Sequence, residues 1–139
     1  AAMGRGATCN DVPIGPCGAD DLSLSLVGTG FTYRAEGRVE QAGVVTRLIG
    51  QVRDIRRLGS AAVDLCLVAC GRLDVYYERG LNSWDAAAGE LIVREAGGRT
   101  SDFTGGPARP EEMVAATPEL HAPFLAALQT AMHTRSTGF

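Results

Sequence analysis

The chain has 139 residues, of which 45% are hydrophobic and 21% are charged, and its formal net charge is -3. This length suffices for one domain with its own core, and the composition excludes a disordered chain. The acidic balance argues against a protein that binds nucleic acid through its phosphates. No apolar run in the sequence is long enough to span a membrane, so we expect no membrane partner and a cytoplasmic location.

Residues 1–17 predict a β-hairpin with Asn10 and Asp11 at the turn and a strand that restarts over 12–14. A lone hairpin is marginally stable in water, so we interpret this segment as part of a larger sheet. Residues 18–139 form the second predicted unit, an α/β domain.

Strands and helices alternate through this second unit. The predicted strands cover 22–27, 52–58, 73–77, 99–103 and 113–116. The predicted helices lie at 39–49, 60–69, 84–96 and around 120–132, and the last either begins or bends at Pro123. Because strands separated by helices favour parallel crossovers, the predicted fold class is α/β, with a mostly parallel but mixed sheet of about five strands flanked by helices.

Two acids fall at the edge of such a sheet where binding sites form, beyond the carboxyl ends of the strands. Glu78 follows the strand at 73–77, and Asp85 lies near the start of the next helix. The helix dipole favours a negative charge there, and an ionised carboxylate is the ligand that magnesium requires. The alternative is that Asp85 caps its helix and Glu78 is a solvated loop acid.

A glycine-containing loop enters the helix at 60–69 and offers a second candidate. Gly59 permits close approach of the backbone, and free amides beside Ser60 and Ala61 could bind an anion or a hydroxyl oxygen. The alternative is a turn glycine followed by a serine that caps the helix. A dinucleotide site at Gly28-Thr29-Gly30 is disfavoured because Tyr33 stands where a third glycine is required.

The four cysteines are Cys9, Cys17, Cys66 and Cys70, and none forms a C-x-x-C pair. Cys66 and Cys70 are four residues apart on a predicted helix and share a face. We expect small buried side chains with free thiols in a reducing compartment, since a zinc site needs more ligands at closer spacing.

Short motifs run through essentially the whole chain. They are WDAAAG at 84–89, IVREAGG at 92–98, RLGSAAVDLC at 57–66, DVYYE at 74–78, TGGP at 104–107, VAAT at 114–117 and GRGATCN at 4–10. Together they resemble the inositol monophosphatase family of magnesium-dependent, lithium-sensitive phosphatases.

The resemblance implies roles for particular residues. Asp85 matches a metal-binding aspartate that also touches the substrate, and Glu78 matches an acid that hydrogen-bonds the substrate's hydroxyl groups. The backbone of Gly59, Ser60 and Ala61 matches a segment that lines the same pocket. Thr32 matches a polar contact after the first strand, although the loop lengths differ there.

Only the C-terminal half of the family pattern is present. The family's other metal ligands are a glutamate in a Gly-Glu pair and two aspartates in an Asp-Pro-(Leu or Ile)-Asp-Gly-Thr motif, and this sequence has no Asp-Pro dipeptide. The resemblance therefore implies a missing N-terminal half as partner, with the hairpin at 1–17 as a remnant of that half's sheet. It also implies a homo-oligomer.

The resulting hypothesis is a C-terminal domain of a phosphatase whose parent uses Mg²⁺ to activate water against a small phosphate monoester. Glu78 favours a polyol such as inositol monophosphate, while fructose bisphosphate, histidinol phosphate and nucleotide phosphates stay open. A lone Asp85 cannot position magnesium, so we expect the isolated chain to be inactive. The alternative is a non-catalytic interaction, dimerisation or regulatory module that retains the fold.

Overall fold

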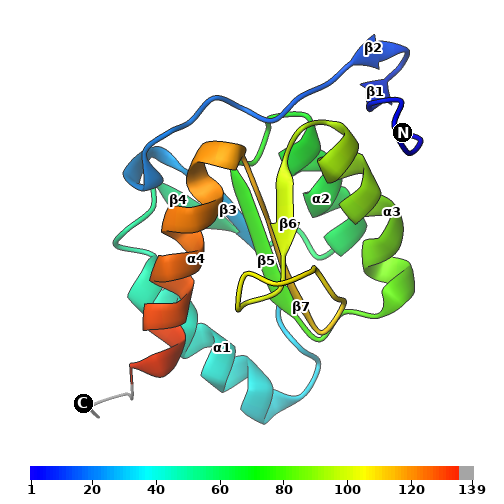
Figure 1. Cartoon of the computed structure of the whole chain (residues 1–139). Helices are drawn as coiled ribbons and strands as arrows, with labels where there is room; N and C mark the ends of the chain where they lie inside the picture. Colours follow the sequence, from blue (N-terminus) through cyan, green and yellow to red (C-terminus); the bar gives the residue numbers. More distant parts are fainter. Residues whose placement is uncertain (135–139) are drawn as a thin grey trace.

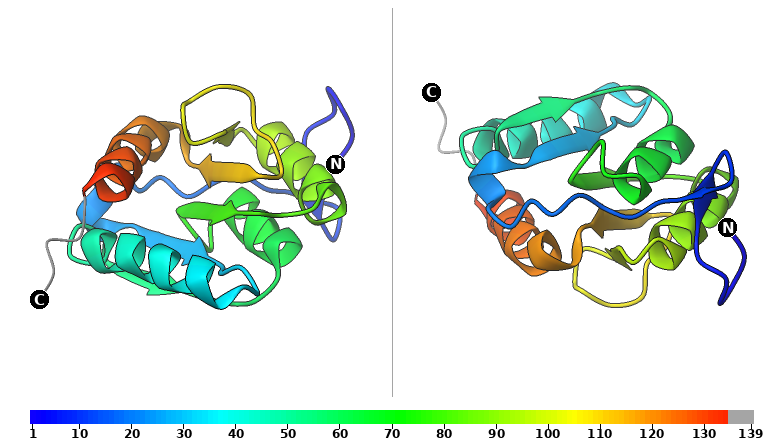
Figure 2. Two further views of the ribbon diagram at one scale, coloured as in Figure 1. Left: turned by 90° about the horizontal axis from the view of Figure 1, so that it is seen from below. Right: turned by 90° about the horizontal axis from the view of Figure 1, so that it is seen from above.

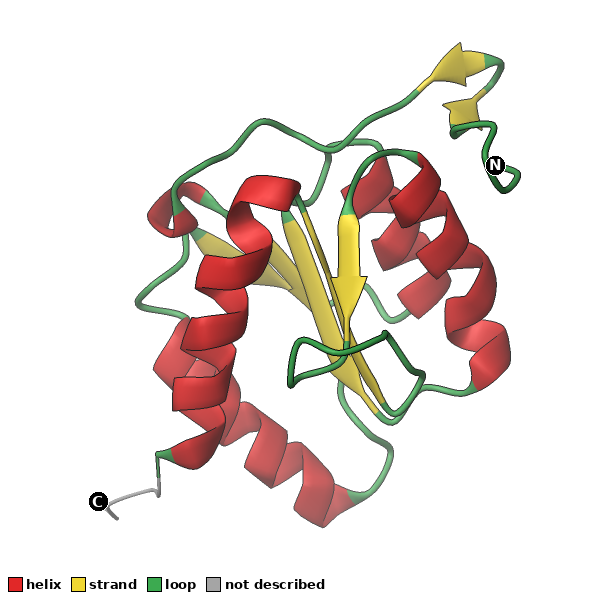
Figure 3. Cartoon of the chain, viewed as in Figure 1, coloured by secondary structure: helices red, strands yellow, loops and turns green. Residues whose placement is uncertain are grey.

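A mixed five-stranded sheet lies between two pairs of helices in the computed structural model, which describes residues 1–134 (Figure 1; Figure 3). The strands, in their order across the sheet, are β4 (Asp54–Arg56), β3 (Leu26–Thr29), β5 (Val75–Arg79), β7 (Glu112–Ala116) and β6 (Arg99–Ser101). The helices are α1 (Ala35–Leu48), α2 (Ala61–Ala69), α3 (Ser83–Glu95) and α4 (Pro118–His133). The predicted α/β class and the strand number are confirmed.

Parallel and antiparallel pairings divide the sheet. Strand β3 pairs in parallel with both β4 and β5, whereas β7 runs antiparallel to both β5 and β6. Helices α1 and α4 cover one face of the sheet, and α2 and α3 cover the other (Figure 2). The carboxyl ends of the three parallel strands therefore lie along one edge, the lower edge in Figure 1.

Each face of the sheet has its own apolar core because side chains alternate along a strand. On β5, Val75 and Tyr77 pack under α1 and α4, while Tyr76 packs under α2 and α3. The same alternation places Glu78 on the α2/α3 face and Arg79 on the α1/α4 face. The end of β5 thus presents a carboxylate to the α2/α3 face of the sheet and a guanidinium cation to the α1/α4 face.

The predicted strand at 22–27 begins later than expected. Residues Leu22–Leu24 form a short 3-10 helix (η1), and β3 starts at Leu26. The cause is local, since the Asp21 side chain accepts hydrogen bonds at 2.8 Å from both the backbone N–H and the hydroxyl of Ser23. Such side-chain bonds offer the backbone an alternative to the strand. The predicted strand at 52–58 is also shorter than expected, since only Asp54–Arg56 form β4, at the edge of the sheet.

The last helix begins before Pro123. Its N-cap is Thr117, whose hydroxyl accepts from the Leu120 N–H at 3.2 Å, and Pro118 occupies the first turn. Pro123 lies inside the helix and is exposed. Its missing N–H leaves the carbonyl of Glu119 without an intrahelical partner, and water can satisfy that carbonyl on an exposed face.

The N-terminal hairpin forms where it was predicted. Strand β1 (Thr8–Cys9) pairs antiparallel with β2 (Val12–Pro13) as a separate two-stranded sheet. Asn10 and Asp11 form the turn with φ values of 50° and 64°, as a two-residue hairpin with the primed twist requires. The hairpin's relation to a larger sheet, and the boundary between 17 and 18, stay predictions.

Glu95 at the end of α3 fixes the N-terminal segment to the domain. Its carboxylate accepts from the backbone N–H groups of Gly4 at 2.8 Å and Gly6 at 2.9 Å. These bonds lower the pKa of Glu95, because they stabilise the charged form. The turn at residues 2–6 is therefore held to α3 by a single acid.

The cysteines are only partly as predicted. All four are free, and Cys66 and Cys70 are half-buried on α2 and at its end. Cys9 and Cys17 are exposed, so the prediction of buried side chains is wrong for them. They lie in the hairpin and in the segment that follows it, outside both cores. No helix within residues 1–134 has the length and apolar character needed to cross a membrane.

Candidate active-site edge

The candidate residues predicted from the sequence lie at or after the ends of the strands β3, β4 and β5, which end at one edge of the sheet. Because these strands are parallel, the segments that follow Thr29, Arg56 and Arg79 leave the sheet on the same side. A β-carbon on Gly30 would collide with the Glu78 carboxylate, so the loop after β3 lies directly against that acid. The edge thus brings together groups that are distant in the sequence.

Glu78 is held in a defined orientation. The Tyr76 hydroxyl, from the same face of β5, donates a hydrogen bond to the Glu78 carboxylate. Burial raises the pKa of Glu78, the Tyr76 hydrogen bond and the Arg57 charge oppose that rise, and the Asp85 charge adds to it. A half-buried acid of this kind suits the recognition of a ligand's hydroxyl groups, because its free lone pairs accept hydrogen bonds.

Asp85 does serve as a helix cap, which was the structural alternative for this residue. Its Oδ2 accepts from the backbone N–H of Asn82 at 3.0 Å, at the start of α3. A carboxylate has further lone pairs that can accept or coordinate, so capping and ligand binding are compatible. Asp85 lies in the first turn of α3, which covers the same face of the sheet as Tyr76, and its charge raises the pKa values of Glu78 and Tyr76.

The start of α2 also combines a structural role with a place at this edge. Gly59 has a φ of +92°, a conformation that other residues rarely adopt. Ser60 caps the helix, its hydroxyl accepting from the Val63 N–H at 3.4 Å, and Ala61 begins the helix. The predicted turn and cap are confirmed, and the assignment of this backbone to a substrate stays a prediction.

Thr32 is placed differently from the other candidates. Its backbone N–H donates to the side chain of Gln41 at 2.8 Å, and its methyl group lies against Gly37. Together with Arg79 and Gly80 it lines a small hollow beside α1. In this loop it is Gly30, rather than Thr32, that lies against Glu78.

Sequence reasoning gave no role to Asp64, Tyr76, Arg57 or Gly30. Asp64 is 1% exposed and occupies the buried stripe of α2 with its apolar neighbours. A charged residue on an otherwise apolar helical stripe was the signal that could have singled it out. Burial and the Glu78 charge raise the pKa of Asp64 to about 6, and the Arg57 charge opposes them.

The described residues do not make a magnesium site by themselves. Within residues 1–134, no group of three or more histidine, cysteine, aspartate or glutamate side chains lies close enough together to hold a metal ion. Magnesium requires near-octahedral coordination by several hard oxygen ligands. Asp85 could supply one of these, so a magnesium ion would need ligands from outside this part of the chain.

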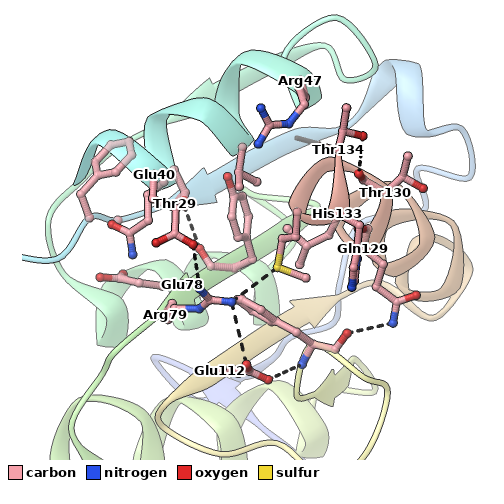
Figure 4. Close-up of a pocket in the computed structure, with 18 of the residues that line it drawn as sticks. Thr29, Glu40, Arg47, Glu78, Arg79, Glu112, Gln129, Thr130, His133 and Thr134 are labelled. Carbon is pink, nitrogen blue, oxygen red and sulfur yellow. Dashed lines mark hydrogen bonds and ion pairs between the residues drawn. The ribbon is translucent and has the colours of Figure 1, made fainter. Parts of the chain in front are cut away.

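A cavity of about 840 Å³ opens on the other face of the sheet, between α1 and α4 (Figure 4). Arg79 extends into it and is paired with Glu40 at 3.6 Å and Glu112 at 4.0 Å. The guanidinium also lies 5.4 Å from the centre of the Phe103 ring. Thr29, Gly30 and Glu78 are among its lining residues, so the cavity adjoins the candidate active-site edge.

Comparison with known proteins shows which family this chain resembles. The model of the inositol monophosphatase family matches residues 1–133. The chain is 50% identical over 115 residues to inositol-1-monophosphatase SuhB of Mycobacterium tuberculosis, a match that covers 81% of this chain and 39% of that protein. It is 47% identical over 107 residues to Nus factor SuhB of Escherichia coli K12, covering 76% of this chain and 40% of that protein.

A solved structure agrees with the fold. The suhB protein of Bartonella henselae superposes with a TM-score of 0.87 at 34% identity, over 93% of this chain and 50% of that one. The chain therefore spans from two fifths to half of the length of the proteins it resembles. On the family match and these similarities, the chain belongs to the inositol monophosphatase family.

Proposed function

We propose that this chain is the substrate-binding half of a magnesium-dependent phosphatase that hydrolyses a small phosphate monoester, with inositol monophosphate as the substrate. The observation that carries the proposal is the Glu78 carboxylate, oriented by Tyr76 at the edge where α2 and α3 begin. An oriented acceptor of this kind suits a polyol, whose hydroxyl groups donate hydrogen bonds.

Each residue at the edge has a part in the proposal. Glu78 accepts hydrogen bonds from the hydroxyl groups of the leaving alcohol, and the backbone of Gly59, Ser60 and Ala61 lines the pocket beside it. Asp85 contributes one carboxylate to the metal site and contacts the substrate. Thr32 is retained as a weaker candidate for a contact at the rim.

The catalytic metal depends on residues beyond this chain. Mg²⁺, with Li⁺ as an inhibitor, is the cofactor that the family resemblance implies. Its remaining ligands would come from an N-terminal half that packs on the outer side of α2 and α3. Leu58, Val63 and Trp84 support this, since they are 51%, 50% and 78% exposed near the starts of these helices and would be covered by such a partner.

A binding experiment tests the substrate assignment on this chain directly. In a titration of the ¹⁵N-labelled chain with myo-inositol 1-phosphate, we expect shifts at Gly30, Glu78 and the 59–61 backbone, and we expect Glu78→Gln to weaken them. The variant Glu90→Gln, on the same helix layer but away from the edge, is the control. Shifts confined to other surfaces would refute the assignment.

An activity experiment tests whether phosphate release requires residues from outside this chain. We expect the chain alone with Mg²⁺ to release phosphate no faster than Asp85→Asn does. Addition of the upstream half of the Mycobacterium tuberculosis relative as a separate chain should restore turnover that depends on Asp85. Phosphate release by the chain alone above the Asp85→Asn level would show that the site is complete without a partner.

The second candidate is a non-catalytic interaction or dimerisation module in the same fold. We keep this candidate because a relative that is 47% identical carries the name Nus factor SuhB, which describes no phosphatase activity. The exposed Val63 and Trp84 would then lie in a protein interface, and the proposed homo-oligomer would form there. The variant Trp84→Ser separates the two candidates. If the chain is an interaction module, analytical ultracentrifugation should show that the substitution dissociates the oligomer. If the chain is half of a phosphatase, the variant should still regain phosphate release when the upstream chain is added.

A further inference from the structure

The cavity between α1 and α4 is used by no step of the proposed function. Its volume of about 840 Å³ lies within the range of small-molecule sites. Its apolar wall includes Tyr77, Phe103 and Leu128, which are 7%, 5% and 0% exposed and belong to the core under α1 and α4. An apolar wall that is fixed in this way accepts the aromatic or aliphatic part of a ligand.

Two arginines enter this cavity from different elements, Arg47 from α1 and Arg79 from β5 (Figure 4). Both are anchored to α4, at consecutive residues. The Arg47 Nε donates to the Ala131 carbonyl at 2.6 Å, and the Arg79 Nη2 lies 3.6 Å from the Met132 sulfur. The two guanidinium groups are therefore held against the same turn of α4.

Most of the hydrogen-bonding capacity of these two groups is unused within residues 1–134. A guanidinium carries five N–H donors. The ion pairs of Arg79 with Glu40 and Glu112 are 3.6 and 4.0 Å long, beyond hydrogen-bond length, and Arg47 bonds through its Nε alone. The buried hydroxyl of Tyr77 also lacks a hydrogen-bond partner in this part of the chain. An anionic oxygen is the ligand group that such donors recognise.

The acids that line the cavity do not cancel its two positive charges. The Glu40 side chain is 72% exposed, so water screens its charge. Glu112 accepts a hydrogen bond from Arg109 at 3.1 Å, and Glu78 accepts one from Tyr76 on the other face of the sheet. The cavity therefore offers cationic donors beside an apolar wall, which is complementary to an anion with an apolar body.

We propose that this cavity is a binding site for a small organic monoanion, a carboxylate on an aromatic or aliphatic body. The carboxylate accepts hydrogen bonds from Arg47 and Arg79, and the apolar body packs on Tyr77 and Phe103. A single charge fits better than the two of a phosphate, because Glu40 remains near Arg79. Inositol monophosphate has no apolar body, so this ligand differs from the proposed substrate and the inference does not depend on the proposed function.

The test is an NMR titration of the full ¹⁵N-labelled chain with 3-phenylpropionate, compared with its neutral isostere 3-phenylpropanamide. We expect saturable amide shifts at Arg79, Phe103 and Met132 with the acid. The neutral amide should bind about tenfold more weakly, because it loses charge-assisted hydrogen bonds. Arg47→Gln and Arg79→Gln should each weaken binding of the acid by about tenfold and leave binding of the neutral amide unchanged.

The matched control is Arg94→Gln, since Arg94 is an exposed arginine on α3, which covers the opposite face of the sheet, and this variant should bind the acid like the wild type. Circular dichroism checks that each variant folds. Equal affinities for the acid and the neutral amide, or no saturable shift at the cavity residues, would overturn the proposal. Displacement of 3-phenylpropionate by myo-inositol 1-phosphate would also overturn it, because the cavity would then belong to the substrate site. Failure of inositol phosphate to bind at all would count against the proposed function alone.

Discussion

Replacing Asp64 by asparagine should change how the stability of the fold depends on pH. Burial and the Glu78 charge raise the pKa of Asp64 from 3.8 to about 6. In the unfolded chain the acid returns to its ordinary value, so the folded state binds this proton more tightly. The stability that the protonated acid contributes is therefore fully present below pH 3.8 and is lost as the pH rises through 6.

The magnitude follows from these two values. Each unit of pKa difference corresponds to about 1.4 kcal/mol, so above pH 7 the ionised Asp64 costs the folded state about 3 kcal/mol. At 1% exposure the carboxyl group has no solvent to screen this cost. The asparagine variant has no ionisable group there, so its stability relative to the wild type should rise by about 2–3 kcal/mol between pH 4 and pH 8.

The assay is urea unfolding of both proteins at several pH values, followed by circular dichroism. Comparing the two proteins at each pH removes the titration of the acids that do not interact with Asp64. The offset at pH 4 reports the intrinsic effect of the amide, and its growth toward pH 8 reports the charge. A difference between the proteins that stays constant from pH 4 to pH 8 would refute the reasoning, whatever the absolute stabilities.

Three other substitutions test the packing. Glu95→Gln should weaken the attachment of the N-terminal turn and speed hydrogen exchange at the Gly4 amide, while the rest of the domain is unaffected. Gly89→Ala should destabilise the fold by about 1–3 kcal/mol in thermal unfolding, because its β-carbon would lie 2.6 Å from the Leu65 Cδ1. Tyr77→Phe should leave stability unchanged or slightly higher, since it removes a buried hydroxyl that has no partner within residues 1–134.

The alternation of strands and helices could be predicted because each long element carries its own periodicity. The helices α2 and α3 end in glycine-containing segments, and the hairpin turn at Asn10 and Asp11 uses residues that tolerate its backbone conformation. The start of β3 could not be predicted, because the Asp21 side chain competes with the strand for local backbone groups. The direction of β7 depends on its neighbours in the sheet, which a local pattern does not specify.

The candidate site was predictable only in part. Asp85 and Glu78 could be placed at one edge because a strand end and a helix start are readable from the sequence. The approach of Gly30 to Glu78 depends on the parallel pairing of β3 with β5, which joins residues 48 positions apart. Asp64 could have been noticed as the charged residue in the apolar stripe of α2, but its raised pKa depends on burial against the sheet and on the nearby charge of Glu78.

The hydrogen-bond register of β5 determines which sign of charge faces each side of the sheet. Glu78 is paired with Met113 and Arg79 with Glu112. A slip of one residue would exchange the two faces, because side chains alternate along the strand. A guanidinium would then lie at the candidate active-site edge, and Glu78 would face Glu112 beneath α1 and α4. The acidity of the site is therefore a property of strand alignment as much as of residue identity.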